Sequence, residues 1–325
     1  MRLILKNFIT VIIVLTIFSS NGLPFEKVGT TSFQFLKVPT DARATGMGEA
    51  YTAVVNTADA VFWNPAALTN VKNIDLSFSY LDYLLDVYHA SLSFAYNVDG
   101  IGTFAVHALM TDVGKIEVTS VDALGYVGDT YNPGLTGETI NPGALAVGLS
   151  FARELTDKFS FGLTSKYVRE DLDVKAKATV VFDAGLLYRT GFRSLQLGAA
   201  VKHFGPEVKY VDESYPLPQT FTIGVSGYLL SPEGAFWMPS NNHRLLLAYD
   251  LSHPRDYTQQ HHVGLEYSFM DLIVLRGGYK FNYDEEGFTF GFGLTRNFIR
   301  FDYSYADFGE FFDAIHRFTV GFKMN

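Results

Sequence analysis

Two short motifs in this 325-residue chain contain residue types that could do chemistry: the pair His261-His262 and the sequence GVSG at 224–227. Adjacent residues of a β-strand point to opposite faces, so the two imidazoles cannot bind one metal ion from a regular strand. GVSG lacks the G-x-S-x-G spacing of a nucleophile elbow. The sequence has no cysteine, which excludes cysteine nucleophiles, cysteine-ligated zinc and disulfides. We therefore expect no enzyme, cofactor site or metal site; a serine–histidine pair assembled across strands stays open, with no motif to support it.

A larger set of charged residues falls on the polar face of predicted strands. The set comprises Lys166, Asp183, Lys202, Asp250, Glu266, Arg276, Lys280, Arg300 and Asp302. One interpretation makes these residues a selectivity path or a polar ligand site. The other pairs them across an interior and with Asp41, Arg43 and Glu49 of the N-terminal segment, because unpaired charges in a partly dry interior are costly. The second interpretation is favoured, since charged interiors are ordinary in β-barrels of the membrane type.

The elements that would carry these charges are segments of about ten residues with period-two alternation. In GFTFGFGLTR, Phe288, Phe290, Phe292 and Leu294 share one face, while glycine and threonine occupy the other. Across the chain the polar face carries glycine, serine, threonine and scattered charges, unlike the lysine- and glutamate-rich surface of a soluble sandwich. This is the lipid-out, lumen-in pattern of an outer-membrane β-barrel, in which closure satisfies every backbone hydrogen bond.

The alternating segments number roughly fourteen, an even number as in bacterial barrels. They are predicted to begin near Ile74, Val87, Ile101, Ala144, Phe159, Thr179, Leu195, Thr220, His243, His261, Leu272, Gly287, Phe298 and His316. With a periplasmic N-terminus, the connections alternate between mostly short periplasmic turns and longer outer loops. The longest outer loop, from Thr111 to Gly143, is rich in glycine, asparagine and proline. We expect it either to be disordered or to fold over the barrel mouth and contact a partner.

The first residues predict export. Arg2 and Lys6 precede an apolar run from Phe8 to Phe18 and then small polar residues, which is typical of a signal peptide cleaved near Gly22. The run is short for an uncleaved membrane anchor. The formal net charge of -9 offers no basic surface for nucleic acid.

Between the signal peptide and the strands lies a segment with a different rhythm. Apolar residues recur at helical spacing between Asp41 and Val55, and Gly46 and Gly48 interrupt them; we expect the glycines to allow close backbone approach or a break. Asn64-Pro65 predicts a helix start, with asparagine as the cap and proline in the first turn, and Trp63 before it can pack back as a staple. The segment is too short to fold alone. Because a fourteen-strand lumen is too wide for wall side chains to fill, we expect it to plug the barrel.

The stretch FLKVPTDARATGMGEAYTAVVNTADAVFWNPAAL, residues 35–68, resembles the N-terminal signature of the PorV/PorQ family, within the FadL-like group of fourteen-strand barrels. The residues that carry the resemblance are Gly46, Met47, Gly48, Asp59, Asn64 and Pro65, with Ala66 after them. The resemblance implies one of two roles. FadL-type members pass hydrophobic molecules across the outer membrane past the hatch, whereas PorV and PorQ handle cargo proteins in type IX secretion.

The sequence thus predicts a signal peptide at 1–22, a helical hatch at 23–72 and an all-β, fourteen-stranded antiparallel outer-membrane barrel at 73–325. The expected function is non-enzymatic and serves protein secretion or surface attachment through the outer loops. The alternative is passive transport of hydrophobic small molecules. Expected partners are outer-membrane lipid, secreted cargo proteins or secretion-system components, or hydrophobic small molecules, and no nucleic acid.

Overall fold

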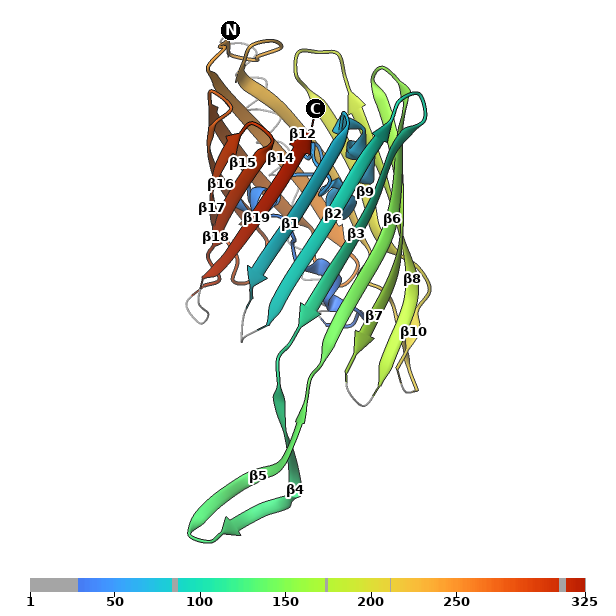
Figure 1. The fold of residues 1–325 in the computed structure, drawn as a ribbon, viewed down its shortest axis with the longest axis vertical. Helices are drawn as coiled ribbons and strands as arrows, with labels where there is room; N and C mark the ends of the chain where they lie inside the picture. Colours follow the sequence, from blue (N-terminus) through green and yellow to red (C-terminus); the bar gives the residue numbers. More distant parts are fainter. Residues whose placement is uncertain (1–28, 84–86, 173–174, 211, 310–313, 325) are drawn as a thin grey trace.

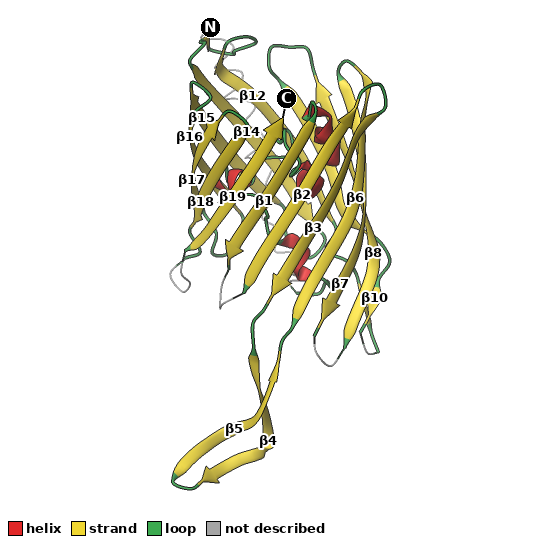
Figure 2. Ribbon diagram, viewed as in Figure 1, coloured by secondary structure: helices red, strands yellow, loops and turns green. Residues whose placement is uncertain are grey.

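The computed structural model describes residues 29–83, 87–172, 175–210, 212–309 and 314–324, and the predicted signal peptide lies outside them. Its main feature is a closed antiparallel β-barrel (Figures 1 and 2). The barrel strands are β1 (Ile74–Asp82), β2 (Tyr88–Val98), β3 (Gly102–Asp112), β6 (Gly143–Thr156), β7 (Phe159–Asp171), β8 (Ala176–Arg189), β9 (Gln196–Phe204), β12 (Thr220–Ser231), β14 (His243–Pro254), β15 (Gln260–Phe269), β16 (Ile273–Phe281), β17 (Phe288–Arg296), β18 (Ile299–Ala306) and β19 (Ile315–Met324). Each pairs with its neighbour in order; β19 pairs with β1, and β9 with β12, so no barrel edge is left open.

The predicted fourteen-strand barrel is confirmed. The largest difference in a strand start is at β8, which was predicted from Thr179 and begins at Ala176. Alternation succeeds because the two barrel faces meet different surroundings: in β17, Phe288, Phe290 and Phe292 are exposed on the outer face, whereas Thr289 is buried in the lumen. Such an outward apolar band is typical of outer-membrane barrels, where it faces the lipid.

The two ends of the barrel differ. One end has short turns, including 99–101, 157–158, 270–272 and 297–298, and β1 begins and β19 ends there. Outer-membrane barrels place short turns in the periplasm and long loops outside, so the opposite end is the outer end. Figure 1 shows a long hairpin projecting from that end, away from the start of β1 and the end of β19. Within the described residues, no helix is long and apolar enough to cross a bilayer.

The hairpin corrects the prediction for the longest loop. It consists of β4 (Ile116–Val127) and β5 (Thr130–Ile140), which pair with each other in a sheet separate from the barrel. The segment is therefore neither disordered nor folded over the mouth. Its turn, Gly128-Asp129, has Gly128 at φ +64°, which glycine adopts without steric cost. Three further short strands are β10 (Val208–Lys209), β11 (Ser214–Tyr215) and β13 (Met238–Pro239).

The predicted hatch occupies the lumen, and we use the word hatch for its described part, residues 29–72. It contains η1 (Gln34–Lys37), α2 (Ala42–Gly46), α3 (Ala60–Trp63) and η2 (Pro65–Asn70), which lie inside the barrel in Figure 2. The helical rhythm predicted between Asp41 and Val55 is realised only in α2, because the chain leaves the helix at Met47. The hatch follows the barrel axis: its first residues contact outer loops, and its last residue precedes β1 at the periplasmic end.

Candidate functional site

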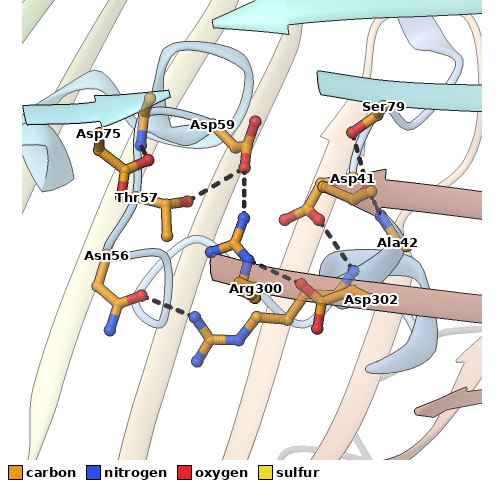
Figure 3. Close-up of polar contacts among 12 residues, drawn as sticks. Asp41, Ala42, Asn56, Thr57, Asp59, Asp75, Ser79, Arg300 and Asp302 are labelled. Carbon is orange, nitrogen blue, oxygen red and sulfur yellow. Dashed lines mark hydrogen bonds and ion pairs between the residues drawn. The ribbon is translucent and has the colours of Figure 1, made fainter. Parts of the chain in front are cut away.

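The most extensive constellation in the lumen is a continuous chain of ion pairs between the hatch and the wall. In order it comprises Arg43, Glu266, Arg276, Asp302, Arg300 and Asp59, joined by nitrogen–oxygen distances of 2.7, 2.7, 2.7, 2.8 and 3.2 Å. The first and last residues belong to the hatch, and the four between them to β15, β16 and β18. Three arginines balance three carboxylates, so the buried chain is neutral. Neutrality limits the cost of removing these charges from water. Figure 3 shows the part around Arg300.

At one end of this chain, Arg43 holds Glu266 through two hydrogen bonds. Its Nε and Nη2 atoms donate to the two carboxylate oxygens at 2.7 and 2.8 Å, and Nη1 donates to Asn56 Oδ1 at 2.7 Å. Asp41 caps α2 by accepting from Arg43 N at 2.9 Å (Figure 3). Burial raises the pKa of Asp41 to about 6, and the nearby carboxylate of Asp59 adds to the rise. The helix start therefore carries an acid that takes up a proton at a higher pH than an exposed aspartate does.

Wall carboxylates and hydroxyls also satisfy hatch backbone groups that its short helices leave open. Asp250 Oδ2 accepts from Tyr51 N and Thr52 N at 3.0 and 2.8 Å. Asp75 Oδ1 accepts from Ala58 N at 2.8 Å, and Ala42 N donates to a wall hydroxyl. Because buried backbone amides must find partners, these bonds fix the path of an irregular segment.

The motif Gly46-Met47-Gly48 contacts the wall backbone directly. A Cβ atom at Gly46 would lie 2.8 Å from the Cα of Gly291, and one at Gly48 would lie 2.8 Å from the backbone N of Tyr279. Gly48 also has φ +61°. Met47, fully buried, packs in the hydrophobic core of the lumen. Both expectations for the glycines, a break and a close approach, are met at this point.

The second half of the motif, Trp63-Asn64-Pro65, fixes the end of the hatch. Asn64 Oδ1 accepts from Ala66 N and so caps η2, while its Nδ2 donates to Thr52 O and Leu186 O at 2.9 and 3.0 Å. The η2 helix packs against β6, β7 and β8. Trp63 packs edge-on against Tyr51, with ring centroids 5.6 Å apart.

The remaining predicted lumen charges form two groups. Lys280 contacts Glu49 of the hatch and Glu286. On the other side of the lumen, Lys166 pairs with Asp183 at 2.6 Å, and Lys202 lies over Trp63, its Nζ 5.1 Å from the ring centroid. The structure thus brings the predicted residues together as a large network and a separate basic group.

Sequence reasoning missed two histidines beside the basic group. His107 and His203 line a cavity of about 50 Å³ together with Lys166 and Lys202. His203 reaches the lumen through a bulge, which shifts the pairing register between Phe182 and Ala184. Alternation alone assigns His203 to the lipid face, so no sequence signal could have located it. His107 falls on lumen parity in β3 and could have been found.

The histidine pair considered first is divided by the wall, as alternation predicts. His261 hydrogen-bonds Tyr249 at 2.7 Å, and His262, buried in the lumen, contacts Gly48 O at 2.8 Å. Within the described residues, no group of three or more histidine, cysteine, aspartate or glutamate side chains could hold a metal ion. What the arrangement can do is hold the hatch in the lumen through ion pairs and backbone contacts.

The fold is similar to several solved outer-membrane proteins. The toluene transporter TbuX of Ralstonia pickettii has a TM-score of 0.56 at 14% identity, covering 87% of this chain and 98% of that chain. The toluene transporter TodX of Pseudomonas putida has 0.56 at 12%, covering 87% and 98%, and a FadL homologue of Pseudomonas aeruginosa has 0.54 at 11%, covering 89% and 99%. At these identities the similarity shows the fold alone.

The sequence itself carries a family match. Residues 24–226 match the family model described as type IX secretion system protein PorV. No protein with a curated description matches the chain. The matched range includes the whole described hatch and the strands from β1 to β9. The chain is an outer-membrane β-barrel protein and belongs to the PorV family.

Proposed function

We propose that this protein is a non-enzymatic outer-membrane barrel that serves protein secretion or surface attachment by binding a protein partner at its outer end. The observation that carries the proposal is the projecting hairpin β4–β5. The family description, type IX secretion system protein, supports the same role. The filled lumen also supports the secretion role, because the hatch occupies the path through the barrel that a transported molecule would need.

The hairpin has the properties of a protein-binding element. Val121, Tyr126 and Val127 are 81, 76 and 71% exposed, although apolar side chains of this size normally bury their surface. A lone two-stranded hairpin is marginally stable in water, and both of its outer edges offer unpaired backbone groups to which a partner strand can add. A partner that adds a strand here would bury the exposed side chains and extend the sheet.

The charge of the hairpin narrows the partner. Residues 116–140 contain no lysine or arginine and four carboxylates, namely Glu117, Asp122, Asp129 and Glu138. An acidic surface favours encounter with a basic partner and disfavours an acidic one. We therefore expect a secreted protein, or a domain of one, with a basic strand at its edge.

The proposal can be tested by photo-crosslinking in the protein's own outer membrane. A photoreactive phenylalanine analogue replaces Tyr126 on the hairpin, and in a matched control it replaces Leu149, which is exposed on the outward face of β6. We expect Tyr126 to yield crosslinks to secreted proteins and Leu149 to yield none. Crosslinks from neither position, with the barrel inserted and folded, would contradict the proposal.

A second function, passive transport of hydrophobic molecules, is favoured by one observation. Apolar side chains gather in the outer half of the lumen, where Leu109, Val168 and Val181 of the wall form a cluster. However, Phe33 and Leu36 of the hatch fill that cluster, and the nearby cavity has about 50 Å³, compared with ~150 Å³ for a cavity that takes benzene. Transport would therefore require the first part of the hatch to leave.

A further inference from the structure

The cavity between the hatch and the wall points to a binding site that is independent of the hairpin. We propose that it binds a compact monovalent anion, a halide or a carboxylate group, with Lys202, His107 and Trp63 as the contacting residues. The cavity, of about 50 Å³, is lined by hatch residues 36–40, 49, 62 and 63 and by wall residues of β3, β6, β7 and β9.

The wall is built irregularly at this place. In β9 the bulge leaves Lys202 and His203 opposite the single residue Asp183, and His203 adopts φ +61°. A non-glycine residue with such a backbone in a strand is strained and persists only where the surroundings hold it. Asp183 Oδ1 provides that support by accepting from His203 N at 2.7 Å. The bulge directs two successive basic side chains toward the cavity, which regular alternation cannot do.

The cavity is lined by hydrogen-bond donors that lack acceptors. Among the described residues, the two ring nitrogens of His107 have no hydrogen-bond partner, and the indole Nε1 of Trp63 has none either. The two residues are only 3 and 7% exposed. An indole N–H can only donate, and a neutral imidazole has one N–H to donate. Buried polar groups without partners are costly, so an acceptor in the cavity would satisfy them.

The ammonium group of Lys202 favours a negative acceptor. Lys166 is neutralised by Asp183 and Lys37 by Asp256, whereas Glu49 shares Lys280 with Glu286. Lys202 is different: within the described part of the chain it has no carboxylate within 4.0 Å, and its contact is the face of Trp63. Lys202 is half-buried, and an ammonium group that is partly removed from water without a counter-charge is unfavourable. An anion beside Lys202 would give its ammonium group the direct partner that it lacks.

The size of the cavity limits the ligand. A water molecule occupies ~30 Å³ of liquid, so a cavity of about 50 Å³ has room for a halide ion or one carboxylate group. The tail of an organic acid would have to enter the apolar cluster that Phe33, Phe35 and Leu36 now fill. A free anion and the head of an organic acid are therefore distinguishable by experiment.

Trp63 provides the reporter, because the chain has only two tryptophans. The full-length barrel with Trp237→Phe, purified in detergent, is titrated with sodium iodide, sodium formate or sodium octanoate at constant ionic strength, and Trp63 emission is recorded. We expect saturable changes with iodide and formate. Lys202→Met should raise the half-saturation concentration about tenfold or more, since a charge-assisted hydrogen bond is lost. Lys202→Arg should retain binding, and Lys209→Met, at an exposed position of the short strand β10, should change nothing.

Each outcome decides the proposal. Octanoate that binds at least tenfold more tightly than formate would identify an organic acid as the source of the carboxylate, and equal binding would identify a compact free anion. If Lys202→Met does not fold, His107→Phe replaces it, and it should weaken binding because a donor is lost while the packing on Phe62 is kept. Linear, non-saturable responses that are the same in the parent and both variants would overturn the site.

Discussion

Substitution of Arg43 by methionine tests whether charge balance holds the hatch in the lumen. Both side chains of the pair with Glu266 are largely buried, at 8 and 10% exposure, so solvent screening is small. Removing Arg43 leaves the chain of ion pairs with one excess negative charge. Loss of one partner of a buried pair costs ~3–5 kcal/mol; we take about 3 kcal/mol, because Arg276 still donates to Glu266.

A second substitution separates charge from packing. In the double variant Arg43→Met with Glu266→Gln, both members of the pair lose their charge, and Arg276 and Arg300 remain bonded to Asp302 and Arg300 to Asp59. The lumen chain is then neutral again. We expect the double variant to recover about half or more of the loss, because pairs in one network do not act additively.

The assay is hydrogen–deuterium exchange of the purified barrel in detergent, followed in peptides covering residues 41–64. About 3 kcal/mol corresponds to exchange on the order of 100-fold faster in Arg43→Met. The control is Arg169→Met, which removes an exposed ion pair with Asp171 and should leave exchange unchanged. Unchanged exchange in Arg43→Met, or a double variant that exchanges faster than Arg43→Met, would refute the reasoning.

Three further predictions follow from the hatch contacts. Burial raises the pKa of Asp41 from 3.8 to about 6. The contribution of its protonated form to the free energy of unfolding is therefore fully present below pH ~4 and is lost as the pH rises through ~6. Asp41→Asn should flatten the decline of thermal stability between pH 4 and 7, measured by circular dichroism. Gly278→Val should displace the hatch and speed exchange there, since a Cβ at Gly278 would collide with hatch backbone, whereas Gly277→Val, with nothing within 4 Å, should not. Asp256→Ala should speed tryptic cleavage after Lys37, because Asp256 accepts its Nζ donor at 2.9 Å; an unchanged cleavage rate would show that other contacts hold that segment.

The barrel could be predicted from sequence because its two faces impose opposite chemistry on successive residues. Alternation such as that of Phe288, Phe290 and Phe292 identifies each strand by itself. Because successive strands pair as hairpins, their order along the chain then gives the barrel topology. The hairpin β4–β5 escaped the same reasoning since both of its faces are exposed to water. Without a buried face no alternation of apolar and polar residues arises, and the glycine, asparagine and proline residues of the segment predict a loop.

The sequence predicts which residues face the lumen, but it does not predict which of them contact each other. Parity placed Glu266, Arg276 and Asp302 inside, and the sequence supplied charges of both signs. Which arginine meets which carboxylate depends on register and tilt across strands far apart in sequence, and these are properties of the closed barrel. The bulge at Lys202 and His203 depends on local pairing with Asp183, which no sequence pattern encodes.

The central claim, that the outer hairpin rather than the lumen carries the function, is tested most directly by removing the hairpin. Residues 115–141 are replaced by Asn-Gly, which leaves the pairing of Asp112 with Gly143 at the ends of β3 and β6 intact, and extracellular proteins are quantified by mass spectrometry in cells that express the variant. The account predicts a folded barrel with a loss of secreted or surface-attached proteins and unchanged uptake of hydrophobic small molecules. Normal secretion by the variant would contradict the account.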